Sequence, residues 1–397
     1  MVQDIITTFQ KLYNQEPIVI RSAGRVNLIG EHTDYNEGFV LPAAIDKELY
    51  FAIAPNGTTS MRAYSFDLHE KSTFNLEQVA PTQTAWANYL LGVVAQLQKA
   101  GHTVPGFDLV FGGNIPMGAG LSSSAAVECG LAYALNHLFG FGLGKMDLVK
   151  MAQKAEHEYA GVMCGIMDQF ASMFGKRNHV IRLDCRSLEY EYFPFDMRDY
   201  RLVLCDTQVK HSLASSEYNT RRQECEAGVT ILQKHYPQVN SLRDVTLEML
   251  ESQKDEFDAV VYRRCTYVVQ ENLRVEQACL DLERGDLEAF GQKMFASHQG
   301  LQHDYEVSCP ELDFLAQVAR GCEGVLGARM MGGGFGGCTI NLVRLSGLEK
   351  FTETVEKAYL QQFNRSLPIY IARIVDGTGL VQTAKPEATG REAEWTR

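Results

Sequence analysis

The chain has 397 residues, of which 45% are hydrophobic and 22% charged, so it carries enough apolar side chains for the cores of about two globular domains. Its net charge is −12 and its lysines and arginines form no cluster, which excludes nucleic acid or an anionic membrane as the main partner. The ten cysteines include no C-x-x-C pair, and neither a signal peptide nor a long apolar run is recognisable. These features predict a cytoplasmic protein with free thiols.

Strand-like and helix-like segments are mixed along the whole chain. Runs rich in β-branched and aromatic residues predict strands, and apolar residues at helical spacing predict helices. The mixture indicates an α+β or α/β protein, and a break in the pattern at 193–196 predicts two domains, 1–195 and 196–397. The predicted strands are 17–24, 48–55, 106–114, 179–184, 200–206 and 338–343, and the predicted helices are 122–138, 145–159 and several within 212–300.

Residues 24–38, GRVNLIGEHTDYNEG, gather charged and hydrogen-bonding side chains after the first predicted strand. Carboxylates accept hydrogen bonds, arginine donates them and histidine can do either, so the set can satisfy sugar hydroxyls. A site of this kind rejects analogues that lack a hydroxyl, because its own polar groups would be left unpaired. The alternative is a solvated loop with incidental ion pairs. The residues concerned are Arg25, Glu31, His32 and Asp34.

A first glycine-rich segment, GNIPMGAGLSSSAA at 113–126, lies between a predicted strand and a predicted helix. Free backbone N–H groups and the positive end of the helix dipole make such a junction an anion site. The string is not a Walker A motif, because no lysine follows Gly120. The alternative is a simple turn with serine caps, although one cap needs one serine and three are present.

A second glycine-rich segment, MMGGGFGGCTINLV at 330–343, contains a G-x-G-x-x-G spacing at Gly332, Gly334 and Gly337. The dinucleotide-binding fingerprint follows a strand and opens a helix, whereas these glycines lead into a predicted strand. We therefore reject a nicotinamide or flavin dehydrogenase. Glycines in this position can still let the backbone pass close to a ligand or to another loop.

Asp168 is the only charged residue between positions 161 and 175, in the run GVMCGIMDQFASMFG. A lone acid in an apolar run is either buried with a partner or catalytic, because burying it unpaired costs several kcal/mol. Arg25 is a candidate partner. Glu156 lies on the preceding predicted helix. The alternative to a functional role is that it is an ordinary exposed residue of that helix.

Five separated motifs in this chain resemble those of the galactokinases, within the GHMP sugar and metabolite kinases. The motifs are GRVNLIGEHTDYNEGFVLP at 24–42, PMGAGLSSSAA at 116–126, CGIMDQF at 164–170, SEYNTRR at 216–222 and GGGFGGC at 332–338. The resemblance covers nearly the whole chain. It implies a two-domain α+β GHMP kinase fold with the active site in the cleft between the domains.

The resemblance assigns catalytic roles to Asp168, as the base toward the anomeric hydroxyl, and to Arg25, which would hold that hydroxyl and the transferring phosphoryl group. The residues that it implies for sugar binding are Glu31, His32, Thr33, Asp34, Gly165 and Tyr218.

The resemblance also implies ATP and Mg²⁺. Ser124 and Glu156 would hold Mg²⁺, which commonly takes few protein ligands and keeps water and phosphate oxygens. Ser65 is implied to contact the nucleotide. The residues that would wrap the ATP phosphates are Gly118, Ala119, Gly120, Leu121, Ser122, Ser123 and Ser124.

The implied reaction is phosphoryl transfer from MgATP to O1 of D-galactose, the first committed step of galactose catabolism in the Leloir pathway. Galactose and MgATP are the implied partners, and the sequence leaves the oligomeric state open, a monomer included. Two alternatives remain: a non-catalytic galactose sensor, and a related kinase for N-acetylgalactosamine, arabinose or galacturonate. The intact GLSSSAA motif and Asp168 favour an enzyme, and Thr33 with NEGFVLPAAID favours galactose.

Overall fold

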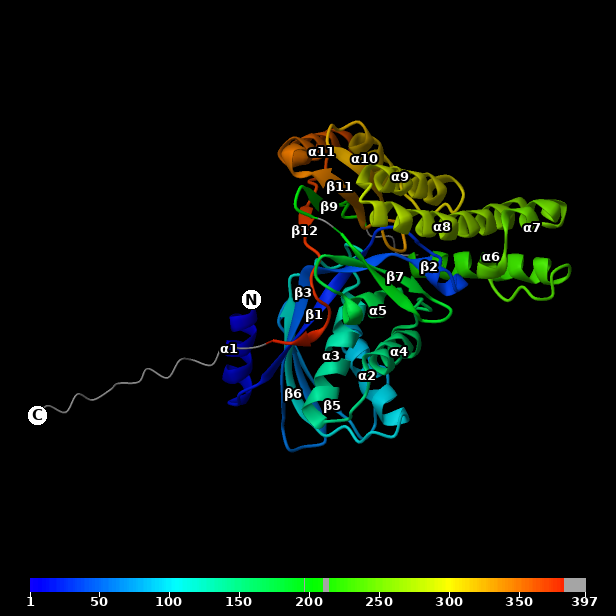
Figure 1. Cartoon of the computed structure of the whole chain (residues 1–397). Helices are drawn as coiled ribbons and strands as arrows, with labels where there is room; N and C mark the ends of the chain where they lie inside the picture. Colours follow the sequence, from blue (N-terminus) through cyan, green and yellow to red (C-terminus); the bar gives the residue numbers. More distant parts are fainter. Residues whose placement is uncertain (196, 210–213, 382–397) are drawn as a thin grey trace, which may run out of the picture.

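The computed structural model describes residues 1–195, 197–209 and 214–381. They form two lobes, with the N-terminal half of the chain in one and most of the C-terminal half in the other (Figure 1). The predicted division at 195–196 meets a residue outside the described ranges, so its position stays a prediction. The polar tail after residue 385 also lies outside them. Among the described residues, no helix combines the length and the apolar character needed to cross a membrane.

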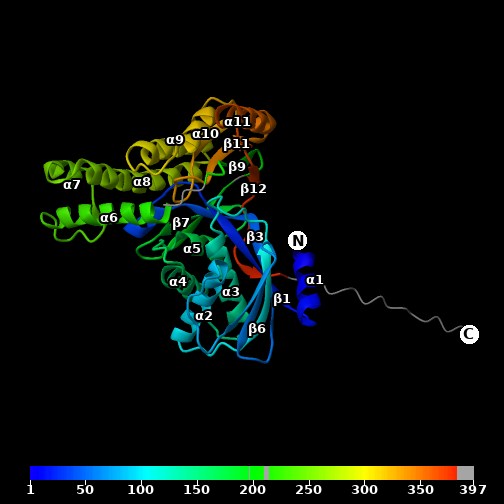
Figure 2. The same ribbon diagram turned by 180° about the vertical axis from the view of Figure 1, so that it is seen from behind.

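The first lobe is built on a six-stranded sheet with the order β13-β1-β3-β6-β4-β5. Helix α1 lies on one face of this sheet, and helices α2 to α5 lie on the other (Figures 1 and 2). The strands are β1 (Ile18–Asn27), β3 (Pro42–Pro55), β4 (Ser60–Ser65), β5 (Glu70–Asn75), β6 (Phe107–Gly113) and β13 (Gly379–Leu380). The helices are α1 (Val2–Tyr13), α2 (Ala85–Lys99), α3 (Ser123–Phe139), α4 (Lys145–Ala155) and α5 (Met167–Phe174).

Strand β1 carries the chain from the core of the sheet into the site. Its pairing with β3 shifts register between Ala23 and Gly24. A Cβ atom on Gly24 would lie 2.9 Å from the carbonyl oxygen of Leu121, so only glycine lets the strand pass this close to the loop before α3. The next residue, Arg25, donates its backbone N–H to that same carbonyl at 3.2 Å.

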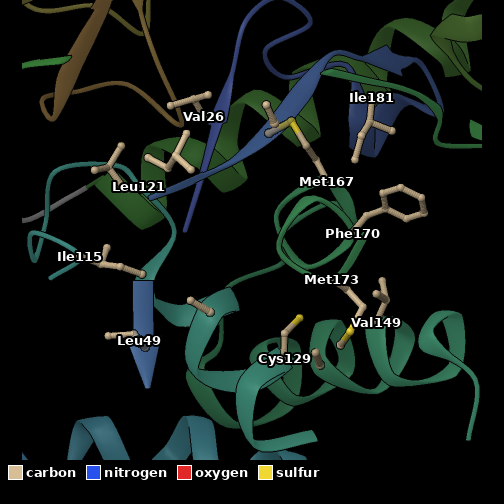
Figure 3. Packing of buried hydrophobic residues seen from close by; sticks show 14 of the residues in the cluster. Val26, Leu49, Ile115, Leu121, Cys129, Val149, Met167, Phe170, Met173 and Ile181 are labelled. Atoms are coloured by element: carbon tan, nitrogen blue, oxygen red, sulfur yellow. The ribbon is translucent and has the colours of Figure 1, made fainter. Parts of the chain in front are cut away.

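Helix α5 is held by apolar residues on one of its faces. Met167, Phe170 and Met173 recur at three-residue spacing, are almost fully buried, and point into a core that also holds Cys129 and Val149 (Figure 3). Fixing this face fixes the direction of the remaining side chains of a short helix. The orientation of the acid in its first turn therefore depends on core packing.

The second lobe contains a four-stranded sheet with the order β10-β11-β9-β12, covered by α9, α10 and α11, and an arm formed by α6 to α8 (Figure 1). The strands are β9 (Tyr200–Asp206), β10 (Val325–Met330), β11 (Cys338–Arg344) and β12 (Ile369–Ala372). The helices are α6 (Ala214–Gln233), α7 (Leu247–Ser252), α8 (Ala259–Arg284), α9 (Leu287–His303), α10 (Pro310–Arg320) and α11 (Leu348–Phe363).

Two features join the lobes. A small sheet of β2 (Phe39–Val40), β7 (His179–Asp184) and β8 (Tyr190–Pro194) lies beside α8, and β13 returns from the second lobe to pair with β1. The predicted α+β class is confirmed, and every segment predicted as a strand overlaps an observed strand. The predicted helix at 145–159 ends as an α-helix at Ala155 and continues as one π-helical turn, Glu156–Ala160. All ten cysteines are free thiols, as predicted.

Candidate active site

A cavity of about 140 Å³ lies where the two lobes meet and collects polar side chains from both. Eight residues predicted from the sequence line it: Arg25, Glu31, His32, Asp34, Glu156, Gly165, Asp168 and Tyr218. The other lining residues are Val162, Cys164, Met167, Gly332 and Gly333. The cavity thus joins the end of β1, the loop that follows it, the N-terminus of α5, α6 and the second glycine-rich segment.

Arg25 and Asp168 form a two-point ion pair at the floor of this cavity. Arg25 Nε donates to Asp168 Oδ1 at 2.7 Å, and Nη2 donates to Oδ2 at 2.8 Å. Arg25 Nη1 donates to the carbonyl of Gly120 at 2.7 Å, and Ser122 Oγ donates to Asp168 Oδ2 at 2.5 Å. Because Arg25 is 4% exposed, this charge-assisted pair is shielded from water on the arginine side. It connects the acid directly to the loop before α3.

The loop before α3 has a left-handed backbone at Gly118, Gly120 and Ser122, with φ of 77°, 76° and 56°. Ser122 is the N-cap residue of α3, but no side chain there accepts a hydrogen bond from the helix. The serines are therefore not simple caps, which was the alternative left open by the sequence. The free N–H groups of the first turn and the helix dipole are available to an anion.

The second glycine-rich segment packs its backbone against this loop. A Cβ atom on Gly332 would lie 3.5 Å from the carbonyl oxygen of Gly120, and one on Gly337 would lie 3.5 Å from that of Ala119. A Cβ atom on Gly334 would lie only 2.1 Å from the carbonyl oxygen of Val307, so a glycine of this segment does allow a close approach to another loop, as predicted. The same segment places the Gly333 carbonyl in the cavity wall.

The loop after β1 presents two buried side chains to the cavity, each held by the second lobe. Glu31 is 2% exposed, and its Oε1 accepts from Arg329 Nη2 at 2.9 Å and from the backbone N–H of Gly332 at 2.7 Å. His32 is 4% exposed, and its Nε2 lies 3.3 Å from the Gly333 carbonyl oxygen. Burial lowers the pKa of His32 to about 3, so the imidazole is neutral at physiological pH.

Asp34 completes the polar wall of the cavity. Burial, with a smaller contribution from the negative charge of Asp168, raises the pKa of the Asp34 carboxyl to about 7. A Cβ atom on Gly165 would lie 1.8 Å from Asp34 Oδ2, so any larger residue at 165 would displace this carboxyl group. Tyr218 covers the ring of His32, with the two ring centroids 5.3 Å apart.

Glu156 is 7% exposed and begins the π-helical turn, a distortion that is frequent at functional sites. Its Oε2 accepts from Gln169 Nε2 at 2.7 Å, and the nearby Ser124 hydroxyl favours the ionised form of the carboxyl. Burial, followed by the charge of Asp168, raises the pKa of Glu156. The adjacent carboxyl oxygen Oε1 of Glu128 is buried without a partner among the described residues.

These groups fit a divalent cation. Among the described residues, no set of three or more His, Cys, Asp or Glu side chains is arranged to hold a metal ion. Mg²⁺ does not need one, since it commonly takes one or two protein oxygens and completes its shell with phosphate and water. The Ser124 hydroxyl and the Glu156 carboxylate would offer hard oxygen ligands, and a cation would relieve the accumulated negative charge.

The remaining predicted residues lie outside the lining of the cavity. The Thr33 hydroxyl lies 2.9 Å from the carbonyl oxygen of Gly30 and 2.6 Å from that of Phe39, so its one proton is used within the loop rather than toward the cavity. Ser65 is the last residue of β4, and its contact with a nucleotide stays a prediction. Leu121, Ser123 and Ser124 belong to the loop and to the first turn of α3.

A larger hollow of about 620 Å³ lies elsewhere, beside β7, β8 and β9, and four arginines line it: Arg177, Arg198, Arg201 and Arg373. None of the predicted site residues belongs to its lining, which among the described residues contains no carboxylate. Size alone therefore does not identify the site. The charged side chains predicted from the sequence converge on the smaller cavity instead.

Comparison with known proteins places this arrangement in a family. Residues 7–55 match the galactokinase galactose-binding signature, residues 88–176 match the GHMP kinases N terminal domain, and residues 279–360 match the GHMP kinases C terminal domain. A galactokinase of Roseiflexus is 42% identical, over 96% of this chain and 97% of its own. The chain belongs to the galactokinase family of GHMP kinases. A galactokinase of Thermotoga neapolitana is 44% identical over 90% of this chain and 98% of its own.

Solved structures agree with this assignment to the galactokinase family. The chain is similar to Lactococcus lactis galactokinase complexed with galactose, with a TM-score of 0.92 and 35% identity over 96% of this chain and 99% of the other. Methanococcus jannaschii mevalonate kinase shares the fold, with a TM-score of 0.63 at 17% identity over 91% of this chain and 99% of the other. The predicted GHMP kinase fold and the predicted kinase activity are confirmed.

Sequence reasoning missed Arg329, which connects the lobes of this galactokinase-family chain. Arg329 lies in β10 with no exposed surface, and donates to the carbonyls of Asn27, Leu28 and Met330 as well as to Glu31. The sequence offered one signal for this role: Arg329 is a single positive charge in an apolar segment just before the second glycine-rich segment. Its partners in the first lobe lie about 300 positions away, so the sequence could not identify them.

The raised pKa of Asp34 predicts a pH-dependent effect of Asp34→Asn on stability. Between pH 4 and 7 the folded protein holds a proton on Asp34 that the unfolded chain releases, so the stabilisation from this proton is lost as pH rises through 7. Thermal unfolding of the ligand-free protein should show Asp34→Asn gaining on the wild type by a few degrees between pH 5 and pH 8. Asp376→Asn removes an exposed carboxylate and is the control for one lost charge. A gain that stays flat or reverses contradicts the assignment.

Proposed function

We propose that this chain transfers the γ-phosphoryl group of ATP to O1 of D-galactose, giving α-D-galactose 1-phosphate and ADP. The observation that carries the proposal is the Arg25–Asp168 pair, which stands between the cavity and the loop at the N-terminus of α3. The galactose-binding signature and the galactose complex of the Lactococcus lactis relative support the choice of sugar. A kinase that uses ATP is consistent with the cytoplasmic location predicted from the sequence.

The sugar would occupy the cavity with its hydroxyls against Glu31, His32 and Asp34. Carboxylates accept hydrogen bonds from hydroxyls, and the neutral imidazole has one donor and one acceptor nitrogen. Gly165 leaves room beside Asp34, and Tyr218 supplies an aromatic face. Because these polar groups are buried, a sugar that fails to pair them leaves unsatisfied groups and binds poorly.

The nucleotide phosphates would lie against the loop at 118–124. The left-handed glycines let phosphate oxygens approach the backbone, and the first turn of α3 supplies N–H donors and the dipole. Ser65 remains a predicted contact of the nucleotide. Ser124 and Glu156 would hold Mg²⁺, which supplies positive charge to the phosphoryl oxygens when bound.

In the transfer step, a bond forms between O1 of the sugar and the γ-phosphorus. The bond between that phosphorus and the β,γ-bridging oxygen breaks, and its electron pair leaves with ADP. The O1 proton passes to the Asp168 carboxylate, while Arg25 stabilises charge on the transferring group. Since the transition state is loose, positioning by Arg25 and Ser122 matters as much as the basicity of Asp168.

Asp168→Asn tests the assigned base. The amide cannot take the proton, so turnover should fall by about 10²–10⁴-fold or more, the range typical of a lost general base. Galactose binding by calorimetry should be largely retained, because the sugar hydroxyls pair mainly with other residues. Asp376→Asn, in an exposed ion pair, should behave as the wild type. Loss of galactose binding together with high residual turnover would show that Asp168 is not the base.

Glu156→Ala tests the proposed Mg²⁺ ligand. The half-saturating Mg²⁺ concentration in the ADP-release assay should rise by about tenfold or more, in the range seen for weakened metal sites. The KM for galactose should change little. Glu158→Ala, two residues further along and exposed in a pair with Lys99, is the matched control. A Mg²⁺ titration that is identical for Glu156→Ala and Glu158→Ala removes Glu156 from the site.

A further inference from the structure

A line of hydroxyl and thiol groups runs behind His32, outside the lining of the cavity. His32 Nδ1 lies 2.7 Å from Tyr35 Oη, and Tyr35 Oη lies 2.8 Å from Tyr305 Oη. Cys225 Sγ lies 3.2 Å from Tyr305 Oη and accepts from Asn36 Nδ2 at 3.7 Å. Tyr305 is 0% exposed and Cys225 is 1% exposed. The line therefore connects the loop of the first lobe to α6 in the second.

All of these groups are neutral at physiological pH. Burial lowers the pKa of His32 to about 3, and it raises the pKa of Cys225 to about 11. Burial also raises the pKa values of Tyr35 and Tyr305 well above their usual range. The neutral imidazole then carries one proton, on one of its two nitrogens.

The partners decide which nitrogen has the proton. Nε2 of His32 faces the carbonyl oxygen of Gly333, which can only accept a hydrogen bond, so the proton is on Nε2. Nδ1 then carries no proton and accepts a hydrogen bond from the hydroxyl of Tyr35. Because each hydroxyl has a single proton, Tyr305 donates to Tyr35, and the thiol of Cys225 donates to Tyr305. The hydrogen bonds all run in one direction.

We propose that this relay, made of Cys225, Tyr305, Tyr35 and His32, fixes His32 as a hydrogen-bond donor toward the substrate, with Tyr35 as the positioning residue. The proposal rests on the proposed function, in that the substrate group at His32 is a sugar hydroxyl. On binding, that hydroxyl replaces the Gly333 carbonyl oxygen, which lies 3.3 Å from Nε2 in the ligand-free protein, as the acceptor of the Nε2 proton, and it turns its own proton to a carboxylate of the cavity. A group that can only donate, such as a protonated amine, is rejected at this position.

The tautomer can be read directly by ¹⁵N NMR of the ligand-free protein. The His32 signals are assigned by their absence in His32→Gln. The wild type should show a protonated Nε2 and a bare, hydrogen-bonded Nδ1. In Tyr35→Phe the Nδ1 signal should move toward that of an unbonded nitrogen, or the two tautomers should mix. A proton on Nδ1 in the wild type overturns the relay, whether or not Tyr35→Phe folds.

Steady-state kinetics then test the effect on the substrate. Tyr35→Phe should raise the KM for galactose by about five- to tenfold, the equivalent of one weakened hydrogen bond, and leave the KM for ATP unchanged. Tyr359→Phe is the matched control, since its buried hydroxyl donates to the Thr207 carbonyl at 2.8 Å, outside the relay. It should change neither the KM for galactose nor the His32 spectrum.

The two proposals fail in different ways. A wild type that shows the expected tautomer but does not phosphorylate galactose contradicts the proposed function and supports the relay. A wild type that phosphorylates galactose, with a Tyr35→Phe variant whose Nδ1 signal and KM for galactose are both unchanged, overturns the relay alone.

Discussion

The ion pair between Arg25 and Asp168 is the constraint on which the site depends. Arg25 comes from the end of β1, Asp168 from the first turn of α5, and the two also bind Gly120 and Ser122 of the loop before α3. Three segments that are far apart in the sequence are thus fixed at one point. Arg25 is buried while Asp168 is partly exposed, so removing the acid would leave a buried guanidinium without its compensating charge and would destabilise this junction. In the proposed reaction, the same pair that holds the segments together also faces the reacting atoms.

A second set of contacts closes the site from the other lobe. The buried guanidinium of Arg329 binds Glu31 and the carbonyls at the end of β1, and the glycines at 332 and 337 bring the backbone against the loop at 119–120. The carboxylate of Glu31, proposed to bind the sugar, is therefore placed by the second lobe, although it belongs to the first. This arrangement explains why Glu31 and Arg329 are tolerated with so little exposure, since both have defined hydrogen-bond partners.

Much of this could be predicted from the sequence, because the information was local. The spacing of apolar residues predicted the strands and helices. The predicted strand that follows the G-x-G-x-x-G spacing excluded a dinucleotide-binding fold. The lone Asp168 in an apolar run correctly indicated a partner, and Arg25 is that partner. Thr33 shows the limit of motif reasoning: it belongs to the signature, but its hydroxyl is used within the loop.

What could not be predicted depends on long-range packing. Nothing near Glu31 in the sequence identifies Arg329, and nothing near His32 identifies Tyr305 or Cys225, because these contacts form only when the lobes meet. The protonation of His32 and Asp34 is likewise a result of burial, which the sequence does not give. The π-helical turn at Glu156 interrupts a pattern that reads as one continuous helix.

The most direct test of the account is a crystal structure of the chain with galactose and a non-hydrolysable ATP analogue. The account predicts that a carboxylate oxygen of Asp168 lies within about 3 Å of O1 of the sugar, the distance that proton transfer requires. It also predicts that Arg25 contacts both O1 and the terminal phosphate. A complex in which both ligands are bound but Asp168 lies well beyond contact with O1 would contradict it.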